Sequence, residues 1–210
     1  MADKYFSLEI GESFLKAVDA KKSDNSLTIT SLGNISSDPM FYNSEIEKNI
    51  ENQASLINKL VNATKITKKN VAVIIPDSFT YTQVLSMPRL TEKELISAIK
   101  YQADQLIPLP IEEINIDVEV LHENEKEKTI TTLIVAAPKK LIEKIQTLIE
   151  MAGLIPESVE NEFSSTGRFL VEFKNLLSSS PNDKIILINL ASKSTSLYFY
   201  DSYLSLIKET

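Results

Sequence analysis

Short apolar segments separated by polar turns occur at both ends of the chain. Three of them open it, at residues 5–10, 14–20 and 27–32. Three more close it, at residues 184–190, 195–200 and 203–207. Short strands joined by polar turns are typical of antiparallel meanders. The sequence therefore predicts two meanders, and their similar layout indicates an internal duplication at long period.

Helical periodicity alternates with further strands between the two meanders. Helices are predicted at residues 44–63, 91–107, 139–152 and 163–177. Further strands are predicted at residues 71–75, 79–86, 114–121 and 129–137. The first of these is continuously apolar, as in a buried central strand. In the first helix the apolar residues share one face: Ile46, Ile50, Ile57, Leu60 and Val61. Gly153 is placed to end the third helix in a left-handed conformation.

Composition excludes several classes of function. The 210 residues carry a formal net charge of −7, whereas nucleic-acid binding requires a basic surface. No apolar run approaches the ~20 residues of a membrane-spanning helix. The first residues lack the basic and apolar regions of a signal peptide, and there is no cysteine. We therefore expect a cytoplasmic protein that does not insert into a membrane.

Several stretches in the middle of the chain carry distinctive motifs. Residues 87–95 read MPRLTEKEL, residues 98–105 read AIKYQADQ and residues 107–113 read IPLPIEE. Residues 135–139 read VAAPK, and residues 152–156 read AGLIP. These stretches resemble the PilM family of type IV pilus assembly proteins. Together with the two meanders, the resemblance covers nearly the whole chain.

The resemblance implies an α/β (α+β) chain with the actin-like ATPase fold. A ribonuclease-H-like subdomain, 1A, would comprise residues 1–77 and 157–180. Residues 78–156 would form an inserted subdomain, 1C. Residues 184–210 would begin the second half, 2A, which would be truncated here. The family is a cytoplasmic scaffold, peripheral to the inner membrane. It contacts pilus motor components and binds the N-terminal peptide of the membrane protein PilN in a groove between 1A and 1C.

Two turns resemble the phosphate-binding hairpins of this family. In the first, the family reads D-I-G-S-x-x-x-K and contacts the phosphates of ATP with its Mg²⁺. Gly11, Lys16 and the adjacent Ser13 are present here, but Glu9 and Glu12 replace the pattern's aspartate and serine. A carboxylate at such a turn repels phosphate. The alternative interpretation of Gly11 is an ordinary hairpin glycine.

In the second turn, Asn189 and Ala191 replace the acid and the glycine of the family's pattern. Only Thr195 occupies the position of a residue that contacts phosphate in the family. We therefore expect ATP to bind weakly or not at all and the chain not to be an enzyme.

A partner surface is predicted where the second helix meets its proline turn. Its residues are Tyr101, Gln105, Ile107, Pro108 and Leu109. Apolar residues beside a rigid turn can form a peptide groove; alternatively, they pack under their own sheet. The only histidine, His122, has no second metal ligand at suitable spacing, so no metal or catalytic site is predicted.

Two other classes of function stay open. One is the cytoplasmic domain of a type II secretion L-like protein, which shares the fold and normally continues into a transmembrane helix. The other is an actin-like ATPase or sugar kinase, which would need intact acidic phosphate loops and glycine-rich adenosine contacts. The leading interpretation is a PilN-binding scaffold.

Overall fold

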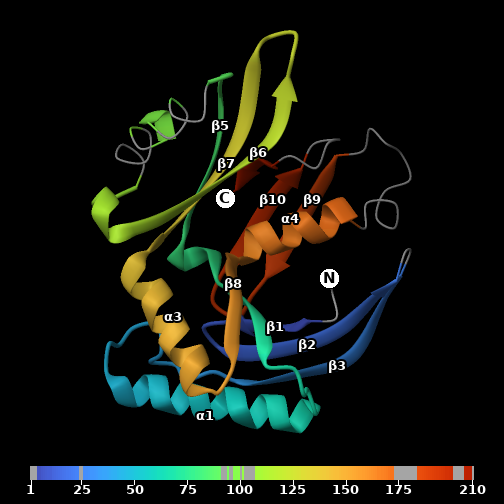
Figure 1. Cartoon of the computed structure of the whole chain (residues 1–210), viewed down its shortest axis with the longest axis vertical. Coiled ribbons are helices and arrows are strands. Elements are labelled where there is room, and N and C mark those ends of the chain that lie inside the picture. The colour runs from blue at the N-terminus through green and yellow to red at the C-terminus, as the bar shows by residue number, and fades with distance from the viewer. Residues whose placement is uncertain are drawn as a thin grey trace. The chain divides into compact units, whose positions relative to one another are not determined.

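The computed structural model describes residues 4–23, 26–90, 94, 97–99, 101, 107–172, 184–200 and 206–209. The chain divides into two compact units, and Figure 1 labels its helices and strands. The first comprises Met1–Pro76 and Ile142–Ser165, and the second comprises Asp77–Leu141 and Thr166–Thr210. A five-stranded sheet lies in the first unit, and two three-stranded sheets lie in the second.

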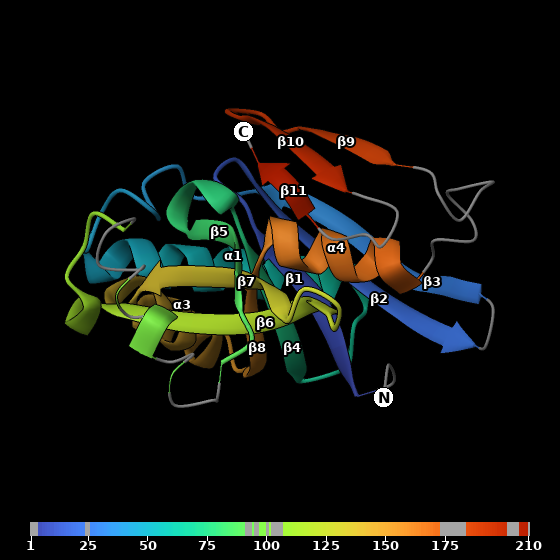
Figure 2. The same ribbon diagram turned by 90° about the horizontal axis from the view of Figure 1, so that it is seen from above.

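The sheet of the first unit has the strand order β3-β2-β1-β4-β8 (Figure 2). Its antiparallel meander is made by β1 (Tyr5–Ile10), β2 (Phe14–Ser23) and β3 (Ser26–Ser36). The predicted meander is confirmed, with β2 and β3 longer than expected. Strand β4 (Asn70–Ile75) runs parallel to β1 and is buried, as its continuous apolar run predicts.

A strand that the sequence analysis did not predict, β8 (Ile155–Asn161), pairs in parallel with the other edge of β4. Since β8 is the last strand of the sheet, its Pro156 is tolerated there. Gly153, just before it, has φ +70°, so its predicted left-handed conformation is confirmed.

Helices α1 (Glu47–Thr64) and α3 (Lys139–Met151) contribute to the core. The buried positions of β1, α1 and α3 are Phe6, Leu8, Ile10, Ala54, Ile57, Leu60, Ile145, Leu148 and Ile149. Helix α1 begins three residues later than predicted, so Ile46 is its N-cap residue and is 64% exposed. The prediction that Ile46 shares the apolar face of the helix was therefore wrong. Gln53 of the same helix is fully buried. Its side-chain oxygen accepts a hydrogen bond from the Asp38 backbone amide, and its side-chain nitrogen donates to the Ser37 hydroxyl.

The first sheet of the second unit has the order β5-β7-β6. It contains β5 (Tyr81–Pro88), β6 (Ile114–Asn124) and β7 (Thr129–Pro138), with single 3-10 turns at Asp77–Phe79 and Ile111–Glu113. The predicted antiparallel pairing of the last two strands is confirmed, although β6 extends into the expected loop. Glu94, residues 97–99 and Tyr101 are helical, as predicted. Residues 91–93, 95–96, 100 and 102–106 of the predicted helix lie outside the described residues, and Ile107, its predicted last residue, is not helical.

Helix α4 (Glu162–Glu172) is confirmed over its described part, and the Asn161 side chain caps it by accepting the Ser164 amide at 3.0 Å. The second predicted meander is confirmed by the antiparallel strands β9 (Ile185–Leu190), β10 (Thr195–Tyr200) and β11 (Leu206–Glu209). No helix among the described residues combines the length and the apolar character needed to cross a membrane.

Candidate functional site

The first candidate turn is closed by a backbone hydrogen bond. The Gly11 amide donates to the Phe14 carbonyl at 3.0 Å, and a Cβ atom at Gly11 would lie 2.8 Å from that same oxygen. Such a contact is closer than real Cβ atoms approach. Gly11 is therefore required by the geometry of its own hairpin, a reason that does not depend on phosphate.

The second candidate turn closes in the same way. The Ala191 amide donates to the Ser194 carbonyl at 3.0 Å. In each meander, therefore, the turn between the first two strands spans four residues and is closed by the same backbone hydrogen bond. Thr195 follows as the first residue of β10, opposite Leu190, and is exposed. The equivalent closure supports the internal duplication predicted from the two meanders.

Lys16, the cation of the first turn, has a carboxylate partner. It lies opposite Glu9 in the β1–β2 register, and its Nζ atom is 2.6 Å from Glu9 Oε1. Ser13 uses its backbone carbonyl to accept the Ser37 amide at 2.9 Å. A phosphate at this turn would therefore have to compete with Glu9 for the lysine ammonium.

Tyr42 lies beside the first turn, and its pKa depends on the charges around that turn. Its hydroxyl donates to the Ile10 carbonyl, one residue before Gly11. Burial raises the pKa of Tyr42 well above its ordinary value, and the carboxylates of Glu162, Glu12 and Glu9 raise it further. Three carboxylates thus act on one buried phenol at this turn. Each of these carboxylates would repel a polyphosphate at this turn.

The loop that carries Tyr42 is tied to α3. Lys144 Nζ donates to the carbonyls of Phe41 and Ser44, the latter at 2.7 Å, and lies 4.6 Å from the centre of the Phe41 ring. Burial lowers the pKa of Lys144, while Glu45 opposes that shift. The Phe41 and Tyr42 rings meet edge-on at 5.0 Å. Sequence reasoning missed both Tyr42 and Lys144, because each acts on residues far along the chain.

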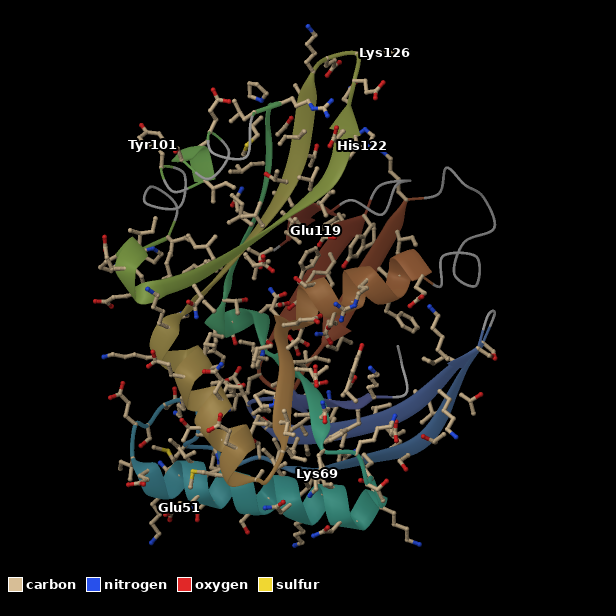
Figure 3. All side chains as sticks on the ribbon, viewed as in Figure 1. Glu51, Lys69, Tyr101, Glu119, His122 and Lys126 are labelled. Atoms are coloured by element: carbon tan, nitrogen blue, oxygen red, sulfur yellow. The ribbon has the colours of Figure 1, made fainter. Side chains whose placement is uncertain are left out.

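The predicted partner residues differ in their accessibility. Ile107 is buried in a cluster with Ile114 and Ala136, and Leu109 packs against that cluster while partly buried. Tyr101 is 65% exposed on its short helical segment (Figure 3), and Pro108 is exposed. Gln105 lies outside the described residues. Of the described residues of the predicted surface, Tyr101 and Pro108 are therefore accessible, and Leu109 is partly so.

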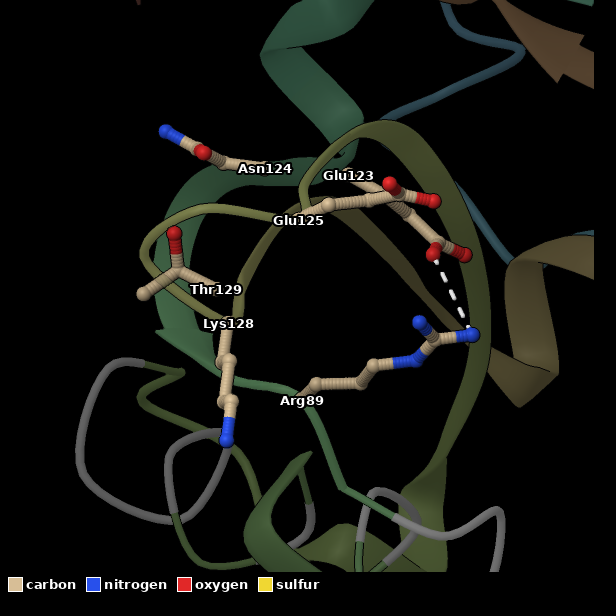
Figure 4. Close-up of a pocket in the computed structure, with 6 residues that line it drawn as sticks. All are labelled: Arg89, Glu123, Asn124, Glu125, Lys128 and Thr129. Atoms are coloured by element: carbon tan, nitrogen blue, oxygen red, sulfur yellow. Dashed lines mark ion pairs between the residues drawn. The ribbon is translucent and has the colours of Figure 1, made fainter.

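A cavity of about 370 Å³ lies where β5 ends beside the β6–β7 turn (Figure 4). Its lining residues are Arg89, Glu123, Asn124, Glu125, Lys128 and Thr129. Arg89 pairs with Glu123 at 3.4 Å, and the Arg89 amide donates to the Lys128 carbonyl. Both partners of the ion pair are about half exposed or more, so the cavity is a solvated hollow with balanced charge.

A family model described as type IV pilus assembly protein PilM matches residues 7–203. The chain is also similar to a solved structure titled as a PilM-PilN type IV pilus biogenesis complex, with 20% identity and a TM-score of 0.83. That match covers 100% of this chain and 61% of the other, so this chain spans less than two thirds of that relative.

Two more distant solved structures have a related fold. One is the cytoplasmic domain of EpsL, an inner membrane component of the type II secretion system of Vibrio cholerae, with 9% identity and a TM-score of 0.59. That match covers 98% of this chain and 70% of the EpsL domain. The other is the Aquifex aeolicus Ppx/GppA phosphatase, type II variant, with 11% identity and a TM-score of 0.50. This second match covers 98% of this chain and 50% of the phosphatase.

Proposed function

The chain belongs to the family of the type IV pilus assembly protein PilM, and on that basis we propose that it is a scaffold which binds a PilN-like membrane protein on the cytoplasmic side of the inner membrane. The match of the PilM family model to residues 7–203 is the observation that carries this proposal. It favours pilus assembly over the type II secretion alternative, to which the likeness is one of fold.

We propose further that the scaffold works without nucleotide chemistry. In the first turn, Lys16 is paired with Glu9, and Glu12 and Glu162 add negative charge around Tyr42. Phosphate binding depends on donors and positive charge that are available to the ligand. The turn therefore offers ATP and its Mg²⁺ less attraction than an intact phosphate hairpin would.

The partner chemistry that suits the exposed residues is an extended, apolar peptide. Tyr101 provides an aromatic side chain at the surface, and aromatic residues are frequent anchors in interfaces. Pro108 lies next to the buried Ile107, which fixes that end of the surface against the core. Since Leu109 packs on the same cluster, replacing it would test folding as well as binding, and Tyr101 is the better position to change.

The test is fluorescence anisotropy with a labelled N-terminal peptide of a PilN-like protein. The unaltered chain should bind the peptide. Tyr101→Ala should raise the dissociation constant at least about tenfold, which corresponds to about 1.4 kcal/mol of binding free energy lost with an anchor residue. Tyr5→Ala is the matched control, since Tyr5 is also an exposed tyrosine and lies in the other unit. Absence of binding by the unaltered chain would refute the scaffold proposal. Equal affinities for all three proteins would remove Tyr101 from the peptide site.

A further inference from the structure

Among the described residues, strand β3 forms a long sheet edge that has a neighbouring strand on one side only. It spans eleven residues, Ser26–Ser36, and is the outermost strand of its sheet. Exposed edges in soluble proteins are commonly protected by lysine, proline or short strand length. The β3 sequence SLTITSLGNIS contains no charged residue and no proline. The backbone groups on its outer side are therefore open to another strand. Its pairing with β2 contains one register irregularity, a feature that can also protect an edge, but the rest of β3 lacks such a device.

One face of this edge is apolar and exposed. Leu27, Ile29 and Leu32 are 41%, 56% and 65% exposed. Ile29 and Leu32 lie opposite Ala20 and Val18 of β2, two residues apart, so they share a face despite the shift in register.

The exposed face is the one turned away from α1. A Cβ atom at Gly33, the neighbour of Leu32, would meet Thr64 and Leu60 of α1. Because neighbouring residues of a strand point to opposite faces, Leu32 and Ile29 face away from that helix. We call Leu27, Ile29 and Leu32, together with the open edge of β3, the β3 strip.

We propose that the β3 strip pairs with the β3 strip of a second copy of this chain, in antiparallel register about a two-fold axis. A two-fold axis places the same patch on both sides of an interface, so the patch must complement itself. An uncharged strand does so, because no like charges meet. The nearest cluster of lysines, Lys21 and Lys22, lies one strand inward on β2.

The lysines of the two copies would remain well separated. They would be about three strand spacings apart, or about 14 Å, which is longer than the screening length of about 8–10 Å at physiological salt. The paired strips would also bring both sets of Leu27, Ile29 and Leu32 into one apolar surface. The interface would consist of the β3 strip alone on each copy. Because such an interface is small, we expect a weak, concentration-dependent dimer rather than an obligate one.

Sedimentation velocity over a concentration series of the full chain, from about 10 to about 500 μM, tests the proposal, since weak dimers dissociate in this range. The unaltered chain should shift from monomer toward dimer, and Ile29→Lys should raise the dissociation constant at least about tenfold. Ile188→Lys is the matched control: Ile188 is 59% exposed and lies on β9, another edge strand. Far-UV circular dichroism and melting temperature check that both variants fold.

A second measurement does not depend on a disruptive variant. The sequence contains no cysteine, so single cysteines introduced at Thr28, Thr30 and Leu32 report only contacts between copies. Pairing about a two-fold axis predicts that one of these positions forms the intermolecular disulfide much faster than the others. A chain that stays monomeric throughout the series would overturn the proposal. So would loss of the dimer in Ile188→Lys, alone or equally with Ile29→Lys, or equal disulfide rates at all three positions.

Discussion

The ammonium group of Lys16 lies 2.6 Å from a carboxylate oxygen of Glu9, its direct neighbour across the first hairpin. A lysine at this position of a phosphate-binding turn would need to face the ligand. Here the side chain is half exposed and satisfied by an intramolecular partner. Glu9 therefore changes the chemistry of the turn even though the pattern's glycine and lysine, Gly11 and Lys16, are retained.

We expect the unaltered chain to show no saturable Mg-ATP binding below about 1 mM by isothermal titration. Glu12→Ser removes one of the carboxylates that act on Tyr42 and should increase any residual affinity. Glu47→Ser makes the same change in charge on the exposed start of α1 and serves as the control. A micromolar dissociation constant for the unaltered chain would contradict the prediction, and so would an equal effect of the two substitutions.

Period-two and period-3.6 patterns were sufficient to predict most of the described elements. The meanders, the buried β4 strand and the β6–β7 pair follow from residues whose burial alternates or runs continuously. Gly153 was also predictable, because its left-handed conformation serves a local purpose at the end of α3. These features depend mainly on neighbours in the sequence.

Features determined by distant contacts were not predictable in the same way. Strand β8 contains only Ile155 and Val159 as large apolar residues and includes a proline, so its strand character depends on pairing with β4. Gln53 reads as a surface residue but is buried, because Ser37 and Asp38 satisfy its amide. The ion pair of Lys16 likewise depends on the register of β1 with β2.

Tyr42→Phe should change how stability depends on pH. The folded chain holds the phenol in its neutral form, with a pKa raised by burial and by Glu162, Glu12 and Glu9. In the unfolded chain it ionises near pH 10. Its contribution to stability is therefore fully present below about pH 10 and is lost as pH rises from there toward the higher folded pKa.

At pH 7 the substitution should cost about 1 kcal/mol, because the hydrogen bond to the Ile10 carbonyl is lost. Between about pH 10 and 11 the difference from the unaltered chain should shrink, since phenylalanine does not ionise. Urea unfolding at several pH values measures both effects. Stability curves that stay parallel over this range would show that Tyr42 ionises equally in the folded and unfolded chains.

Lys144→Met tests the contact between α3 and the loop before α1. It removes the donor to the Phe41 and Ser44 carbonyls and the cation above the Phe41 ring. We expect a loss of about 1–2 kcal/mol in the free energy of unfolding. Lys140→Met, at an exposed position of the same helix, should change it by less than about 0.5 kcal/mol. Equal effects of the two substitutions in urea unfolding would mean that the contact adds no stability.

Gly33→Ala should destabilise the first unit through a contact that can be relieved. The new Cβ atom would lie 2.4 Å from Thr64 Cγ2 and 3.3 Å from Leu60 Cδ1. Thr64 cannot easily rotate away, because its hydroxyl donates to the Leu60 and Val61 carbonyls. Forcing a side chain into packed space costs about 1–3 kcal/mol.

The double variant Gly33→Ala with Thr64→Ser isolates the cause. Serine keeps the hydroxyl but lacks Cγ2, the atom in closest contact, so most of the stability lost in Gly33→Ala should return. The single variant Thr64→Ser is needed to complete the thermodynamic cycle, and a coupling of at least about 0.5 kcal/mol is expected between residues in contact. Melting temperature and urea unfolding of all four proteins give the coupling energy. Additive effects would show that the strand accommodates alanine by moving away from α1 instead.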